Sequence, residues 1–140
     1  MPLKDIFKMV IFINIYCYKL DIDPDIIMAI FADESDFYPR AISPKEAKGL
    51  GQIMPANFVE LGIKQPFDIL ENVRGTIFHL YKELRSWKIM NQRQLELTLA
   101  AYNEGYPKIS WALRHKKWTY GIRVYAPKVM KSRQAFESLK

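Results

Sequence analysis

The sequence has a single cysteine and only two histidines among its 140 residues. Cys17 has no partner within the chain, which excludes an intrachain disulfide and a zinc site built from pairs of cysteines. His79 and His115 lie far apart in the sequence and do not form a metal-binding pair. We therefore predict no metal site, and no residue pattern indicates a cofactor.

Long runs of one charge are also missing, because no stretch of lysine and arginine exceeds two residues. The totals of 21 basic and 15 acidic residues still give a net charge of +6. A basic surface favours encounter with nucleic acid, anionic membranes or bacterial wall polymers, and charge alone does not choose among them. Since no motif of an RNA-binding sheet is present, we predict no nucleic-acid partner.

No apolar run is long enough to span a bilayer. Lys4 and Lys8 precede the apolar residues 9–18, an order that loosely resembles a signal peptide. However, Asn14 interrupts this run and no small-residue cleavage site follows it. We therefore interpret the segment as the first amphipathic helix of the fold and predict neither a signal peptide nor a membrane span.

What the sequence does contain is an apolar fraction of 49%, enough to bury a sizeable core. Its apolar residues recur at helical spacing and no segment shows the alternation of a strand. The predicted helices cover residues 4–19, 24–35, 55–61, 70–88 and 95–103, with two more within 108–132. We predict an all-α fold, a compact lysozyme-like single domain over residues 1–140, and a monomer.

Two helix starts carry specific signals. Asp23 is followed by Pro24, which predicts an N-cap with proline at the first helical position. Ser43-Pro44-Lys45-Glu46 has the form of a capping box, and we expect a short helix to begin there.

Three carboxylates, those of Asp33, Glu34 and Asp36, lie at the end of the very apolar segment 24–35. Glu34 continues an apolar row through Ile27, Ile30 and Phe31, so burial and the negative end of the helix would favour its neutral, protonated form. Glycosidic bond cleavage needs such an acid. Asp33 continues a similar row, and three solvated acids at a helix end are the structural alternative.

The surrounding motifs are more specific. They are Glu34-Ser35, Ala41-x-Ser43-Pro44, Ala47-x-Gly49-Leu50-Gly51-Gln52, Met54-Pro55, Asn72 with Gly75, Ala100-Ala-Tyr102-Asn103-Glu-Gly105 and Tyr125-Ala-Pro-Lys-Val129. In this order they closely resemble the motifs of the soluble lytic transglycosylases, a family related to goose-type lysozyme. The resemblance extends from about residue 20 to residue 130.

The resemblance implies that Glu34 is the sole catalytic acid and base. It also implies a set of substrate-binding residues: Ser43, Gln52, Met54, Tyr102, Asn103 and Tyr125. Some of these have structural alternatives, since Ser43 is a good helix cap and Tyr102 a common core residue. Two positions depart from the family: Gly51 replaces the usual methionine, and Glu104 replaces the usual alanine and is interpreted as a surface acid.

The remaining conspicuous side chains have ordinary interpretations. Trp87, Trp111 and Trp118 can stack on sugars, but packing in a core or on a surface is commoner. The basic residues 114–117 are more typical of a solvated face than of a binding patch.

The implied reaction is cleavage of peptidoglycan between N-acetylmuramic acid and N-acetylglucosamine, with a 1,6-anhydro end as product. Two alternatives stay open: a goose-type hydrolase, in which Asp36 or Glu104 helps to activate water, and a non-catalytic module that binds wall polymer. A basic nucleic-acid-binding domain ranks last. The implied location is the periplasm, the cell wall or a virion.

Overall fold

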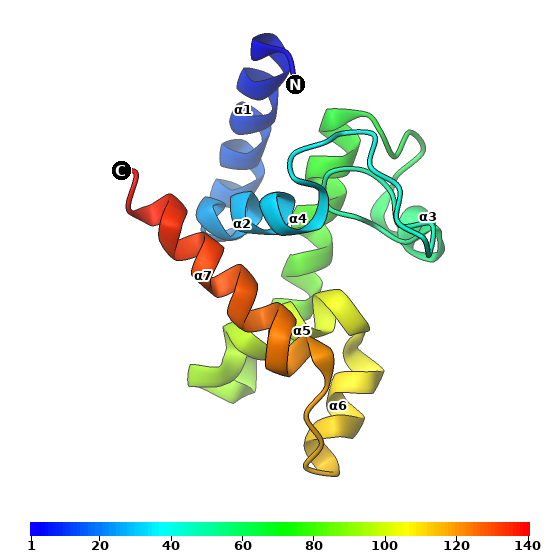
Figure 1. Ribbon diagram of the computed structural model, residues 1–140, viewed down its shortest axis with the longest axis vertical. Coiled ribbons are helices and arrows are strands. Elements are labelled where there is room, and N and C mark those ends of the chain that lie inside the picture. Colours follow the sequence, from blue (N-terminus) through cyan, green and yellow to red (C-terminus); the bar gives the residue numbers. More distant parts are fainter. The chain divides into compact units, whose positions relative to one another are not determined.

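The computed structural model describes all residues from 1 to 140, and its regular elements are helices only (Figure 1). They are α1 (Leu3–Leu20), α2 (Pro24–Ser35), η1 (Pro55–Asn57), α3 (Phe58–Leu61), α4 (Ile69–Ser86), η2 (Lys88–Arg93), α5 (Gln94–Glu104), α6 (Tyr106–Arg114), η3 (Gly121–Tyr125) and α7 (Ala126–Glu137). The short elements η1 and η2 are 3-10 helices, whereas η3 is a π-helix. The all-α prediction is confirmed.

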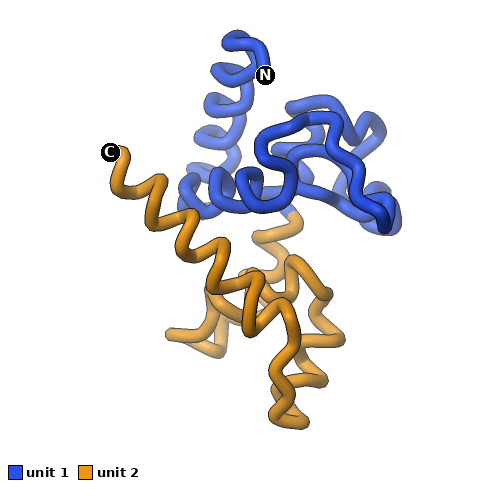
Figure 2. The backbone as a smooth tube through the Cα atoms, in the orientation of Figure 1, with its two compact units in different colours: residues 1–78 blue, residues 79–140 orange.

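The chain divides into two compact units, residues 1–78 and residues 79–140 (Figure 2). The boundary falls within α4, whose first half belongs to unit 1 and whose second half belongs to unit 2. The single domain that the sequence predicts for residues 1–140 stays a prediction.

In unit 1, α1 and α2 pack against each other. α1 buries Met9, Ile13 and Cys17, which follow one another at four-residue spacing along one side of the helix. α2 begins where the sequence predicts: Pro24 is its first residue, and the Asp23 carboxylate accepts a hydrogen bond of 2.9 Å from the Asp25 amide. None of the helices combines the length and the apolar character that crossing a membrane requires.

The helix predicted to start at Ser43 is wrong, because residues 41–54 form a loop closed by two isolated bridges, Ile42 to Lys48 and Lys48 to Ile53. The Ser43 hydroxyl accepts from the Ala47 amide at 3.0 Å, and the two backbones also bond at 2.9 Å. Glu46 has φ 72, outside the helical region, so the chain turns back instead of coiling.

Asn72, in the first turns of α4, fixes this loop from more than twenty residues away. Its buried amide accepts from the Gly51 backbone at 2.8 Å and donates to the carbonyls of Lys48 at 3.1 Å and Pro66 at 2.8 Å. Gly49 has φ +80 and lies under the Asn72 side chain, where a Cβ atom would overlap it. The loop therefore requires glycine at position 49.

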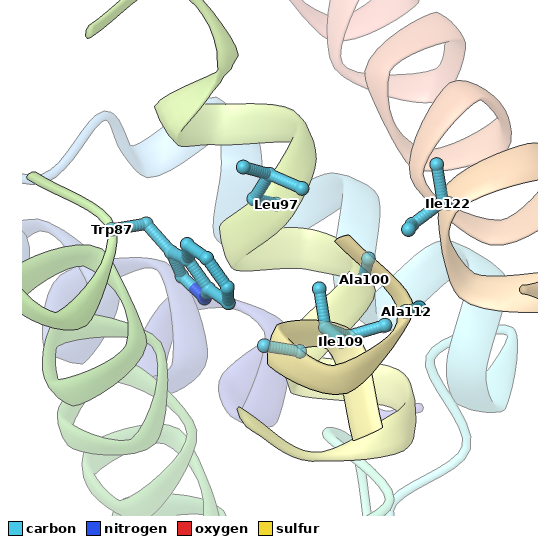
Figure 3. Close-up of a cluster of buried hydrophobic side chains, with 7 residues drawn as sticks. Trp87, Leu97, Ala100, Ile109, Ala112 and Ile122 are labelled. Carbon is cyan, nitrogen blue, oxygen red and sulfur yellow. The ribbon is translucent and has the colours of Figure 1, made fainter. Parts of the chain in front are cut away.

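The core of unit 2 gathers around α5, which packs against α6, α7, η2 and η3. Figure 3 shows its cluster of buried side chains converging between these elements. The cluster consists of Trp87, Leu97, Ala100, Ala101, Ile109, Ala112 and Ile122. Trp87 is only 5% exposed and its ring lies 5.0 Å from that of Tyr106, so the prediction that it packs in a core is confirmed.

Candidate active site

Glu34 is half-buried in the last turn of α2, one residue before the helix ends. Two backbone hydrogen bonds close the end of the helix. The Asp36 amide donates to the Ala32 carbonyl at 3.2 Å, and the Phe37 amide donates to the Phe31 carbonyl at 3.3 Å. Asp36 and Phe37 both take left-handed conformations, with φ 50 and φ 59. Two successive left-handed residues that are not glycine are unfavourable, and such backbone is concentrated at functional sites.

Two neighbours of Glu34 have other roles. The Ser35 hydroxyl donates a hydrogen bond of 3.0 Å to the Phe31 carbonyl, so this hydroxyl is engaged within its own helix. Asp36 is exposed and forms the C-cap of the helix. Of the three acids grouped by the sequence, Asp33 and Glu34 are both half-buried within α2, whereas Asp36 is exposed at its end.

The loop 41–54 contains three of the predicted substrate-binding residues, Ser43, Gln52 and Met54. The Gln52 side-chain amide donates to the carbonyls of Ala41 at 3.2 Å and Gly49 at 2.9 Å. Gln52 also has φ 51, so it holds the loop in a strained turn. Both printed contacts of this side chain use its nitrogen and none within the loop uses its oxygen. Met54 is exposed and precedes η1 as its N-cap.

The other predicted site residues lie in unit 2. Tyr102 and Asn103 occupy the last turn of α5, with the tyrosine buried and the asparagine exposed. The Tyr102 ring packs on the His79 ring with 4.8 Å between centroids and an interplanar angle of 51°. Tyr125 is buried at the end of η3, which packs against α5. π-helices are rare and are frequent at functional sites.

Glu104 is not the surface acid that the sequence suggests, because its side chain is only 10% exposed. It accepts from the Gly121 amide at 2.9 Å and pairs with Lys108 at 2.9 Å. Burial alone would raise the pKa of Glu104, but hydrogen bonds from Thr119, Lys108 and Gly121 and the charge of Lys108 together lower it. Glu104 is thus an ionised carboxylate that ties α5 to the segment entering η3.

The sequence motifs do not reveal this tie, nor the role of Asn72 in the loop. Asn72 belongs to one of the family-like motifs, but its partners are separated from it by up to 24 residues. No local signal distinguishes the π-helix from an ordinary helix at residues 121–125.

Comparison with known proteins identifies the family. The family model described as the transglycosylase SLT domain matches residues 12–123, which is most of the chain. This chain belongs to the transglycosylase SLT family. The resemblance to soluble lytic transglycosylases seen in the motifs is therefore confirmed.

Curated relatives of this SLT chain carry consistent names. It is 30% identical over 114 residues to a transglycosylase of Enterobacteria phage PRD1, a match that covers 81% of this chain and 38% of the relative. It is 33% identical over 88 residues to the membrane-bound lytic murein transglycosylase F of Yersinia pestis, covering 61% of this chain and 18% of the relative. The SLT chain thus spans well under half the length of these proteins.

The fold of the SLT chain also matches a solved structure. The 70 kDa soluble lytic transglycosylase of Escherichia coli superposes with a TM-score of 0.75 at 21% sequence identity. The match covers 91% of this chain and 24% of the larger protein. At this identity the comparison establishes a shared helical fold.

Proposed function

We propose that this chain is a peptidoglycan lytic transglycosylase with Glu34 as its single catalytic acid and base. The observation that carries the proposal is Glu34, half-buried at the end of the apolar helix α2, within the segment that matches the transglycosylase SLT family. The names of the curated relatives support the same reaction. The proposed substrate is the glycan strand of peptidoglycan.

In the proposed reaction, Glu34 first donates its proton to the oxygen that links N-acetylmuramic acid to N-acetylglucosamine. The bond from that oxygen to the anomeric carbon breaks, and the N-acetyl group of the muramic acid stabilises the positive charge that develops. The Glu34 carboxylate then removes the proton from the 6-hydroxyl of the same sugar. The 6-oxygen bonds to the anomeric carbon, so a 1,6-anhydro ring forms and no water is consumed.

A hydrolase would instead need a group to activate water, and the sequence offers Asp36 and Glu104 for that role. Glu104 accepts hydrogen bonds from Gly121 and Thr119 and is paired with Lys108, so it already serves to hold unit 2 together. Asp36 is exposed and caps α2. These positions favour the anhydro product over a hydrolytic one.

We assign the substrate-binding roles by the same reasoning. Gln52 would accept a hydrogen bond from a sugar hydroxyl or amide, since its donors are already used by the loop. The further proposed contacts with substrate are Ser43, Met54, Tyr102, Asn103 and Tyr125. The proposed site of action is the cell wall, reached from the periplasm or from a virion, and the proposed active form is a monomer.

The test is digestion of purified peptidoglycan by wild type, Glu34→Gln and the matched control Asp36→Asn, with products weighed by mass spectrometry. We expect wild type and Asp36→Asn to release anhydro-muropeptides, and Glu34→Gln to lose about 10²–10⁴-fold of the rate while keeping its helical circular dichroism. Full activity of a folded Glu34→Gln protein would overturn the catalytic assignment. Products heavier by one water would assign the chain to the hydrolases, and intact peptidoglycan with wild type would indicate a binding module.

A further inference from the structure

Unit 2 contains a cavity of about 320 Å³ at the C-terminal end of α6. It is lined by Arg93, Ala112, Leu113, Lys116, Lys117 and Trp118. None of these residues belongs to the set predicted for the active site. The cavity is at the lower end of the range of about 300–1,000 Å³ that is usual for ligand pockets, which suits one sugar residue with a short substituent.

The cavity wall is held by a defined turn rather than by a loose loop. Helix α6 ends with two backbone hydrogen bonds. The Lys116 amide donates to the Leu113 carbonyl at 3.3 Å, and the Lys117 amide donates to the Ala112 carbonyl at 2.8 Å. This pair of bonds is the Schellman arrangement, in which the residue after the cap is left-handed and is usually glycine. Here that residue is Lys116, with φ 53. The left-handed conformation is unfavourable for lysine. Lys116 and the next residue, Lys117, both line the cavity.

Trp118 is the aromatic component of the cavity wall and is 65% exposed. In the hydrophobic core of unit 2, in contrast, Trp87 is buried almost completely. Packing on the surface does not explain Trp118, because most of the residue is exposed to solvent. An exposed indole offers an apolar face to the C–H face of a pyranose ring and an N–H donor at its edge.

The charged side chains that line the cavity are all basic. Arg93 is the one lining cation that is paired, through two contacts of 3.3 Å with the Glu96 carboxylate. Lys116 and Lys117 are exposed, and no lining residue is acidic. Two lysine charges beside an exposed tryptophan therefore favour a ligand that joins an anionic group to a sugar ring.

We propose that this cavity binds a muramoyl residue of the wall through the carboxylates of its peptide substituent, with the sugar ring on Trp118 and the carboxylates on Lys116 and Lys117. This inference rests on the proposed function, because it takes the substrate polymer as the ligand. The site would be a second point of attachment that selects strands carrying free peptide carboxylates.

The test is titration of the full chain with N-acetylmuramoyl-L-alanyl-D-glutamic acid, which carries two free carboxylates, followed by NMR. This probe has no bond between two sugars, so it is not cleaved and its binding is measured whether or not Glu34 is catalytic. We expect shifts of the Trp118 indole N–H and of the Lys117 amide, and a dissociation constant that rises about ten-fold in Trp118→Ala. Lys117→Gln should weaken binding less, and N-acetylglucosamine should bind more weakly than the probe.

Trp111→Ala is the matched control, since Trp111 is an exposed tryptophan of α6, 47% accessible, that does not line the cavity. It should bind the probe as wild type does. The proposal is overturned if Trp118→Ala binds like wild type, if Trp111→Ala weakens binding equally, or if a short DNA oligomer displaces the probe at lower concentration. A Glu34→Gln protein that still cleaves would overturn the proposed function without changing the binding result.

Discussion

Replacing Asn72 by alanine tests whether one side chain holds the loop 41–54 in place. The change removes the acceptor of the Gly51 amide at 2.8 Å and the donors to Pro66 at 2.8 Å and Lys48 at 3.1 Å. The Lys48 carbonyl also accepts from the Ile53 amide, so its loss matters least. The two backbone groups that are most affected are therefore the Gly51 amide and the Pro66 carbonyl.

A buried polar group left without its partner costs about 1–3 kcal/mol, so two such groups cost about 2–6 kcal/mol. Pro66 is half-buried, and water can replace part of its lost bond, which moves the value toward the lower end. We expect Asn72→Ala to lower the free energy of unfolding by about 3 kcal/mol. For a chain of this size that loss corresponds to a fall of about 10 °C in Tm.

The assay is urea unfolding followed by circular dichroism, with thermal unfolding in parallel. Asn14→Ala is the matched control, because Asn14 is exposed on α1 and its side chain makes one hydrogen bond within the helix, to Val10. Its expected loss is below about 0.5 kcal/mol. If the two variants lose the same stability, or if Asn72→Ala loses less than about 1 kcal/mol, then the loop is held by other contacts and our reasoning is wrong.

Three further predictions concern single side chains. Gly49→Ala should destabilise the fold by about 2–4 kcal/mol, whereas Gly62→Ala should cost only about 1 kcal/mol. Both glycines have positive φ, but the added methyl would overlap Asn72 only at Gly49. Equal falls in Tm for the two variants would contradict this. The folded-state pKa of Glu104 lies below the ordinary 4.5, so the stability that its carboxylate contributes is present above that value and is lost as the pH falls through the lowered pKa. The difference in free energy of unfolding between wild type and Glu104→Gln should therefore close on acidification, as measured by urea titrations at successive pH values. A constant difference would contradict the assignment. Burial raises the pKa of Cys17 to about 12, so at pH 8 the folded protein should react with Ellman's reagent far more slowly than the unfolded protein, and fast labelling of the native state would contradict it.

Helix α2 shows how far the sequence alone can reach. The sequence predicts its bounds, Pro24 to Ser35, because the signals that set them are local: Asp23 caps the first turn and the apolar residues follow helical spacing. The position of Glu34 in the last turn follows directly. Its catalytic role, in contrast, comes from the resemblance of the surrounding motifs to a family.

The loop after α2 shows why local signals fail. Ser43 has the capping residue of a helix, yet its hydroxyl accepts from an amide four residues on and the chain turns back at Glu46. The conformation is decided by bonds between Lys48 and Ile53 and by Asn72, which lies 24 residues beyond Lys48. A pattern of four residues does not contain that information.

Glu104 gives the same lesson for the site. Replacement of a small residue by an acid at a helix end is normally interpreted as surface variation. Its partner, the Gly121 amide, lies 17 residues away, and Gly121 has no room for a side chain because the carboxylate oxygen would be 2.6 Å from its Cβ. Only the folded chain shows that the two residues depend on each other.

The π-helix η3 also determines where this chain can change in length. A π-turn holds one residue more than an α-turn, so a helix with a π-turn can lose one residue and remain a helix. Arg123 and Val124 are the exposed residues of η3, whereas Tyr125 and the following Ala126 are buried. Deletion of one exposed residue would leave an ordinary α-turn that keeps these buried positions on the same side. When related sequences are aligned, a one-residue gap at 123–124 is therefore compatible with an unchanged fold, and equivalent residues of α7 should be matched by their burial rather than by their distance from Gly121.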